Sequence, residues 1–205
     1  MNEIKRIVFA SGNSGKAREI RATFQGLFGD SVELVLQGEL GIIGAEETGL
    51  TFLDKALLKA RHAAEASGLP ALADDSGIEV DALAGAPGVR SARFAGTNAS
   101  AKDNLDKLLH ELHGVPAEQR TARFRCALAY VRGVDDPSPL VADGVWEGRI
   151  ALTPSGHDGF GYDPVFIDGG SGLSAAELAP AAKNATSHRG RALLKLREGL
   201  RTAGL

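Results

Sequence analysis

Residues 69–96, LPALADDSGIEVDALAGAPGVRSARFAG, join a short apolar run to two adjacent carboxylates, a turn and two arginines. The apolar run, residues 69–73, predicts a buried strand. Asp74 and Asp75 end that strand, and a Ser-Gly break follows at once. Acidic residues, a turn and basic residues this close together do not suit a hydrophobic core. The stretch therefore predicts a strand that delivers carboxylates to a site for a metal ion and an anion.

The two aspartates are not expected to share one role. Side chains of neighbouring strand residues point to opposite faces of a sheet. One carboxylate should therefore face the site, and the other should fix the turn that the following Ser-Gly pair predicts. The two arginines of the stretch, Arg90 and Arg93, have two open interpretations, as ligands of phosphate or as braces of their own loop.

Strand-like and helix-like segments interleave along the chain, which predicts an α/β protein. Patterns of Ser or Thr followed three residues later by Asp or Glu mark helix starts at residues 51, 100 and 174. Adjacent strands near residues 120–152 predict hairpins, so the sheet should be mixed. The expected strands are 4–10, 32–36, 69–73, 120–132 and one or two within 140–152, and the expected helices are 16–28, 51–67, 100–114, 174–182 and 189–202.

The composition of the 205-residue chain is ordinary for a globular protein, with 43% hydrophobic and 24% charged residues. A net charge of −3 provides no basic excess, so neither nucleic acid nor an anionic membrane is an expected partner. No apolar stretch approaches the ~20 residues that span a bilayer, and the N-terminal run is too short for a signal peptide. A cytoplasmic protein with one domain over residues 1–205 and no separable linker is expected.

The only cysteine, Cys126, excludes an internal disulfide and a cysteine cluster for zinc. It lies in residues 122–131, ARFRCALAYV, where apolar and polar residues alternate as in a half-buried strand. This setting predicts a buried strand thiol rather than a nucleophile.

Residues 11–16, Ser-Gly-Asn-Ser-Gly-Lys, lie between an expected strand and an expected helix. A helix N-terminus offers free N–H groups and the positive end of the dipole, and Lys16 adds a full charge, so the segment predicts a cradle for phosphate. The alternative is a tight turn in which Asn13 or Ser14 caps the helix, although a lysine in the first turn opposes the dipole and needs another reason. The spacing is not that of a Walker A loop.

Two acidic residues, Glu46 and Glu47, precede the helix expected from residue 51. Carboxylates at a helix start commonly act as partners of the helix dipole. Magnesium prefers hard oxygen donors, so the same carboxylates are also candidate metal ligands.

The loop at residues 160–164, FGYDP, and a basic cluster formed by Lys183 and residues 187–190, SHRG, supply aromatic and donor groups. An aromatic on such a loop either stacks on a base, worth about 1–3 kcal/mol, or is buried. Lys and Arg only donate hydrogen bonds and His can donate, which suits the oxo groups of a base or phosphate oxygens. The alternative for the His-Arg pair is solvated surface.

In their order along the chain, these segments resemble the inosine triphosphate pyrophosphatase family, whose members hydrolyse non-standard purine nucleoside triphosphates. The resemblance implies two α/β lobes around a long mixed sheet with flanking helices, an active-site cleft between the lobes, and a homodimer. The matching segments are SGNSGK at 11, AEETG at 45, ARH at 60, ADDSG at 73, GAPGVRSARFAG at 85, FGYDPVF at 160 and SHRG at 187.

The family likeness implies hydrolysis of ITP, dITP or XTP to the monophosphate and pyrophosphate, with Mg2+ as cofactor, which keeps deaminated purines out of DNA and RNA. Asp75 and Lys16 would be catalytic, and Glu46 with Asp75 would hold the metal. A carboxylate bound to a cation is a weak base, so the two roles of Asp75 compete. Asp74 would support the turn. The implied substrate-binding residues are Ser11, Gly12, Asn13, Ser14, Gly15, Lys16, Ser76, Phe160, Gly161, Tyr162, Asp163, Lys183, His188 and Arg189.

Two other functions compete with this one. A kinase or GTPase could use residues 12–16 as a short phosphate loop, but two residues rather than four separate the first Gly from Gly-Lys, and Ala17 stands where Ser or Thr is needed. A non-catalytic nucleotide-binding protein gains nothing from carboxylates beside phosphates unless a metal is held.

Overall fold

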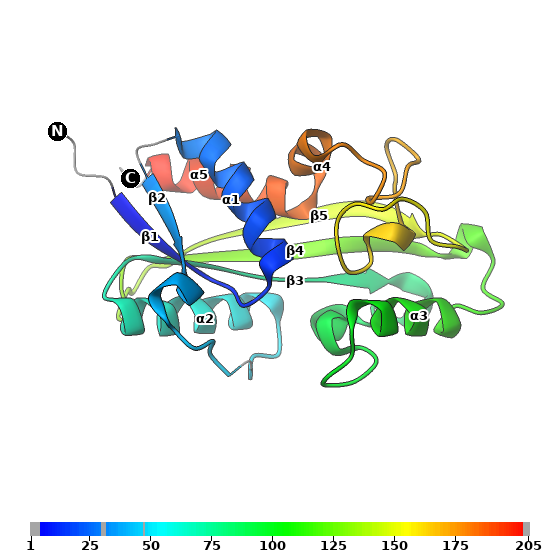
Figure 1. Ribbon diagram of the computed structural model, residues 1–205, viewed down its shortest axis with the longest axis horizontal. Coiled ribbons are helices and arrows are strands. Elements are labelled where there is room, and N and C mark those ends of the chain that lie inside the picture. The colour runs from blue at the N-terminus through cyan, green and yellow to red at the C-terminus, as the bar shows by residue number, and fades with distance from the viewer. Residues whose placement is uncertain (1–4, 30–31, 47, 203–205) are drawn as a thin grey trace. The chain divides into compact units, whose positions relative to one another are not determined.

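A computed structural model of the protein describes residues 5–29, 32–46 and 48–202 (Figure 1). Glu47, which the sequence groups with Glu46 as an acidic candidate, lies outside these residues. Within the described part of the chain, no helix combines the length and apolar character that crossing a bilayer requires.

The described strands form one mixed sheet, as the sequence predicts, in the order β2-β1-β3-β4-β5-β6. Strand β1 pairs in parallel with both β2 and β3, whereas β5 pairs antiparallel with β6. The expected segment 140–152 is a single strand, and the short β6 was not predicted. The strands are β1 (Lys5–Ala10), β2 (Val32–Leu36), β3 (Ala71–Val80), β4 (Thr121–Val131), β5 (Leu140–Ile150) and β6 (Phe166–Asp168).

Helix starts follow the side-chain caps in two of the three predicted places. Thr51 Oγ1 accepts a hydrogen bond from the Asp54 N–H at 3.1 Å, and the Asp54 carboxylate accepts one from the Thr51 N–H. Ser100 and Asp103 make the same reciprocal pair. The helices are α1 (Ser14–Phe28), α2 (Phe52–Ser67), α3 (Ala101–Glu111), α4 (Pro180–Thr186) and α5 (His188–Thr202).

The third predicted helix start, at Ser174, is wrong. The Glu177 carboxylate does accept a hydrogen bond from the Ser174 N–H, at 2.8 Å, but the chain only turns there. Ala179 has extended backbone angles because the following proline disfavours helical ones, and Pro180 then occupies the first turn of α4. A helix starting at Ser174 cannot run through this point.

The break predicted at Ser76-Gly77 is also wrong, because β3 runs through both residues to Val80. The strand lies between β1 and β4 in the sheet. Ile78 and Val80 are fully buried beyond the predicted break, so pairing and burial override the local preference of Ser and Gly for turns.

The chain divides into two compact units. Unit 1 contains the described residues within Met1–Asp75, Cys126–Gly144 and Arg189–Leu205. Unit 2 contains Ser76–Arg125 and Val145–His188. The divisions fall inside β3, β4 and β5, so each unit takes part of these three strands.

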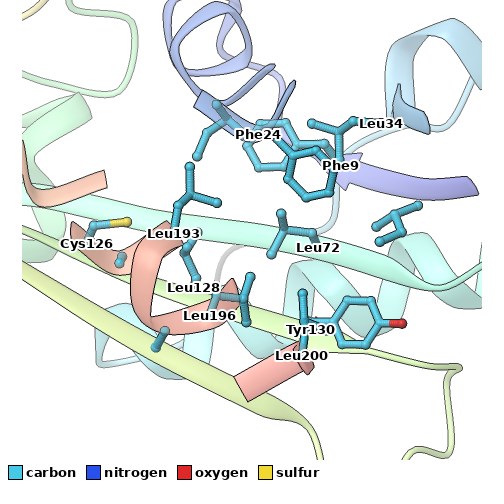
Figure 2. Close-up of a cluster of buried hydrophobic side chains, with 14 of the residues drawn as sticks. Phe9, Phe24, Leu34, Leu72, Cys126, Leu128, Tyr130, Leu193, Leu196 and Leu200 are labelled. Atoms are coloured by element: carbon cyan, nitrogen blue, oxygen red, sulfur yellow. The ribbon is translucent and has the colours of Figure 1, made fainter. Parts of the chain in front are cut away.

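In unit 1, helices cover both faces of the strands (Figure 1). On one face, Phe9 and Leu72 of the strands pack with Phe24 of α1 and Leu196 of α5 (Figure 2). On the other face, small side chains let α2 lie close to β1, β3 and β4. The alanines that α2 contributes to this second cluster are Ala56, Ala60, Ala63 and Ala64.

The core of unit 2 is richer in aromatic residues. Trp146 of β5 and Phe166 of β6 are nearly inaccessible to solvent, and Phe124 of β4 packs against both rings. Leu105 and Leu108 of α3 belong to the same cluster. Tyr162, one of the predicted site residues, belongs to this core.

Replacement of Leu196 by alanine tests the core of unit 1, because this α5 side chain is 1% exposed. We expect Leu196→Ala to lower the free energy of unfolding by about 2–5 kcal/mol, measured by urea denaturation. Leu194, two residues away and 45% exposed, is the matched control, and its replacement by alanine should change stability by less than about 0.5 kcal/mol. Equal losses in the two variants would contradict the packing described above.

Candidate functional site

Strand β3 alternates between the two faces of the sheet in unit 1. Leu72 belongs to the cluster formed with α1 and α5, and Ala73 belongs to the cluster formed with α2. By the same alternation, Asp74 points towards α1 and α5, and Asp75 points towards α2. Their ion-pair partners lie on the corresponding helices, so the prediction that the two aspartates have opposite orientations is confirmed.

Asp74 is a fully buried carboxylate with two cationic partners. Its Oδ2 lies 3.1 Å from Lys16 Nζ and 3.4 Å from Arg189 Nε, and Arg189 Nη1 also lies 2.8 Å from Glu19 Oε2. Burial alone would raise the pKa of Asp74, but Lys16 and Arg189, assisted by Lys59, lower it well below its ordinary value. Asp74 thus joins α1 to α5 as a carboxylate that is ionised at neutral pH. The expectation that it supports a turn is wrong, because it lies within a continuous strand.

The ion pair with Asp74 also explains Lys16, whose position in the first turn of α1 opposes the helix dipole. Asn13 caps the helix, since its Oδ1 accepts a hydrogen bond from the Lys16 N–H at 3.0 Å. Ser11 Oγ accepts one from the Asn13 N–H at 3.2 Å. Gly12, Asn13 and Ser14 are exposed. The segment is therefore a capped turn, and its exposed face at a helix N-terminus is also what anion binding requires.

Asp75 lies against α2, where its Oδ1 accepts a hydrogen bond from Lys59 Nζ at 2.9 Å. The two side chains are 9% and 12% exposed. Burial raises the pKa of Asp75 above its ordinary value, although Lys59 and Lys16 act in the opposite direction. A carboxylate with a raised pKa is a stronger base, which suits proton abstraction from water.

Three charged side chains of unit 1 were not predicted from the sequence. Lys59 pairs with Asp75, Glu19 pairs with Arg189, and Lys55 is only 1% exposed. A detectable signal existed for Lys59, which interrupts the apolar face of α2 at helical spacing from Ala56 and Ala63. No comparable signal marks Glu19, whose partner lies 170 residues away in the sequence.

Oxygen donors for a metal ion are few. Glu46 is exposed in the segment before α2. Among the residues that the structure describes, no three His, Cys, Asp or Glu side chains converge on one point. Mg2+ nevertheless commonly binds through one or two carboxylates, with waters and substrate phosphates completing its shell. Asp75 and Glu46 have the right chemistry for an ion that arrives with a polyphosphate.

In unit 2, Asp163 organises the predicted aromatic loop. Its Oδ2 accepts hydrogen bonds from the Phe160 N–H and from Lys183 Nζ, both at 2.7 Å. Gly159 has a φ of +82°, and a Cβ at this residue would lie 2.2 Å from the same carboxylate oxygen, so only glycine fits. Lys183 Nζ lies 5.6 Å from the centre of the Phe160 ring, which is a cation–π distance. The buried ion pair thus fixes a partly exposed phenyl ring.

Tyr162 has a structural position instead. Its side chain belongs to the hydrophobic core of unit 2, and its hydroxyl donates a hydrogen bond to the Ser91 carbonyl oxygen at 2.8 Å. Burial raises the pKa of Tyr162 far above its ordinary value. The two interpretations of the aromatic loop therefore apply to different residues: Tyr162 is the buried aromatic, and Phe160 is the ring that could stack on a base.

The remaining candidate residues of unit 2 lie in the aromatic loop, on β3 and on a 3-10 helix. Gly161 is half-buried between the two aromatic residues, and Ser76 is half-buried on β3. Arg90 and Arg93 are exposed on the 3-10 helix Gly88–Arg93, whose Ser91 anchors Tyr162. The segment that carries these arginines therefore holds the aromatic loop in place.

The His-Arg pair is not solvated surface. His188 is 2% exposed and its ring stacks on Phe124 of β4, with centroids 4.8 Å apart and an interplanar angle of 10°. Arg189, the next residue along the chain, is 6% exposed and paired with Glu19 and Asp74 in unit 1. Burial of a histidine and an arginine at the start of α5 costs free energy unless specific interactions compensate for it.

Replacement of Asp74 by asparagine leaves Lys16 and Arg189 without their shared counter-charge, so we expect a loss of stability of about 3–5 kcal/mol at pH 7. The folded-state pKa of Asp74 lies below its ordinary value of 3.8. Its stabilisation is therefore complete above that pH and is lost as the pH falls below it. Urea unfolding of both proteins at several pH values should give a difference that shrinks below about pH 4. A difference that is constant with pH would contradict the ion-pair assignment.

Comparison with known proteins agrees with the residues described above. The sequence model of the Ham1 family matches residues 7–199. A curated relative from Yersinia pseudotuberculosis, named dITP/XTP pyrophosphatase, is 54% identical over 200 residues, which are 98% of this chain and 100% of the relative. A relative of the same name from Methylococcus capsulatus is 55% identical over 197 residues, 96% of each chain.

Solved structures show the same likeness. The structure of a HAM1 protein from Coxiella burnetii has a TM-score of 0.86 and 46% sequence identity, and the match covers 97% of this chain and 99% of that chain. The Staphylococcus aureus Ham1 protein has a TM-score of 0.83 and 38% identity, and the match covers 97% of this chain and 100% of that one. The resemblance read from ordered sequence segments is confirmed, and the chain belongs to the Ham1 family.

Proposed function

We propose that this protein hydrolyses the triphosphates of non-standard purine nucleosides, namely ITP, dITP and XTP, to the monophosphate and pyrophosphate. Relatives named dITP/XTP pyrophosphatase, which match nearly the whole chain, support the proposal. The structural observation that carries it is the pair of adjacent aspartates on β3. Asp74 is ionised at neutral pH and holds Lys16, whereas Asp75 has a raised pKa and is suited to accept a proton.

The segment Ser11–Lys16 binds the triphosphate in this proposal. The exposed backbone at the N-terminus of α1 presents N–H groups to phosphate oxygens, and the helix dipole favours negative charge there. Lys16 Nζ, held by Asp74, places a positive charge beside the same helix end. This charge stabilises the pyrophosphate as it leaves.

Asp75 and Glu46 would hold Mg2+ when the nucleotide binds. When bound there, Mg2+ would supply charge neutralisation of the triphosphate and help to orient it. Asp75 would also accept a proton from the attacking water, a role that competes with holding the ion. Burial of its carboxylate makes it a better base than an exposed aspartate. Lys59, hydrogen-bonded to Asp75 Oδ1, fixes the carboxylate and leaves its second oxygen as the one to bind the proton or the metal.

Recognition of the base belongs to Lys183, His188 and Arg189, assisted by stacking on Phe160. Hypoxanthine and xanthine carry an oxygen at position 6, where adenine carries an amino group. Donors from His188 and Arg189 pair with the oxygen, whereas an amino group would leave them unsatisfied at about 1–3 kcal/mol per buried group. Such a site rejects adenine strongly. Guanine shares the 6-oxo group, so its exclusion depends on contacts near position 2 of the base.

The protein would act in the cytoplasm as a homodimer, removing deaminated purine nucleotides before a polymerase incorporates them. Its partner is then a small nucleotide rather than nucleic acid, which agrees with the absence of a basic excess in the sequence. The kinase and GTPase alternative differs in its products, because it transfers phosphate or releases orthophosphate.

A nucleotide panel tests the proposal directly. We expect ITP, dITP and XTP with Mg2+ to yield monophosphate and pyrophosphate. ATP, GTP, CTP and UTP should react at least about 100-fold more slowly. Addition of EDTA should abolish turnover, and excess Mg2+ should restore it. Release of orthophosphate as the first product would indicate the GTPase-like alternative, and nucleotide binding without hydrolysis would indicate a non-catalytic protein.

A further inference from the structure

The imidazole ring of His188 has an aromatic support inside unit 2. Phe124 of β4 lies face to face with it, at 4.8 Å and 10°, and Trp146 of β5 lies nearly parallel at 6.3 Å and 17°. We propose that Phe124 is a positioning residue for base recognition, because its ring fixes the plane of the His188 imidazole. The inference rests on the proposed function, in which His188 donates to the 6-oxo group of the base.

A flat neighbour controls the direction in which a histidine donates. The N–H bonds of imidazole lie in the ring plane, so rotation of the ring about its bond to Cβ redirects them. That rotation has broad, weak intrinsic preferences, because it joins an sp³ carbon to an sp² ring. Parallel contact with Phe124 restricts the rotation. The ring edge of His188, where both nitrogens lie, is then presented in one plane.

Phe124 is itself held firmly. It is 8% exposed, and its ring packs on Phe166 at 4.6 Å and on Trp146 at 6.1 Å. Trp146 is fixed in turn by a hydrogen bond from its Nε1 to Asp168 Oδ1 at 2.7 Å. The support for His188 is thus a connected set of rings on neighbouring strands β4, β5 and β6, rather than a single mobile side chain.

A variant at Phe166 distinguishes a positioning role of Phe124 from a contribution to core packing alone. It belongs to the same cluster, is fully buried, and makes tilted contacts with Phe124 at 53° and with Trp146 at 60°. These tilted contacts differ from the parallel contact of Phe124 with His188. Phe166→Leu therefore removes the same volume from the same core while keeping both rings of the Phe124–His188 stack.

The test compares wild type, Phe124→Leu, Phe124→Tyr and Phe166→Leu by kcat/KM for ITP and for ATP. We expect Phe124→Leu to lower the preference for ITP about 3-fold to 10-fold, mainly through a higher KM for ITP. Phe124→Tyr keeps a flat ring and should retain the preference. Phe166→Leu should lose thermal stability and retain the preference.

A second measurement reports on the ring itself without turnover. The phenyl ring current shifts the His188 imidazole protons upfield in the NMR spectrum of the nucleotide-free protein. These signals should move downfield in Phe124→Leu and stay in place in Phe124→Tyr. Imidazole signals that do not move in Phe124→Leu would overturn the stack.

The kinetic outcomes distinguish this inference from the proposed function. A wild type that hydrolyses ITP and ATP equally well overturns the proposed function. An ITP-selective wild type with an equally selective Phe124→Leu variant overturns only the positioning role. Loss of selectivity in Phe166→Leu to the same extent as in Phe124→Leu would also overturn it, because a general disturbance of the core would then explain both.

Discussion

The buried charge of Asp74 is the interaction on which the organisation of unit 1 depends. A carboxylate removed from water is unfavourable unless cations and hydrogen bonds compensate for it. Lys16 and Arg189 provide that compensation from α1 and α5, and Glu19 in turn pairs with Arg189. One oxygen of Asp74 therefore connects the first turn of α1 with the start of α5. The strand between them fixes where these two helix ends lie.

In the proposed function, the neighbouring Asp75 performs the chemistry while Asp74 carries the structural charge. Alternation along β3 turns the two carboxylates to opposite faces, so their ion pairs are with lysines of different helices. Burial lowers the tendency of Asp75 to ionise while two lysines oppose that effect, which leaves a carboxylate poised to take a proton. In unit 2 the same principle recurs, since the ion pair of Asp163 with Lys183 places Phe160 and leaves its ring partly exposed.

Local sequence patterns predicted the features that interactions between residues close in the chain determine. The caps at Thr51 and Ser100 and the opposite faces of the two aspartates follow from spacing alone. The helix at Ser174 failed because the effect of Pro180 on the residue before it outweighs a capping pattern. The partners of Asp74 and the stack of His188 on Phe124 join residues far apart in the chain, so only the folded structure reveals them.

Binding of Mn2+ in the presence of a non-hydrolysable ITP analogue, followed by electron paramagnetic resonance, tests the central claim that adjacent aspartates have separate tasks. Asp75→Asn and Asp74→Asn make the same chemical change at neighbouring positions, so each is the control for the other. The account predicts that Asp75→Asn abolishes tight Mn2+ binding and that Asp74→Asn retains it. Retention of Mn2+ by Asp75→Asn together with its loss in Asp74→Asn would contradict the account.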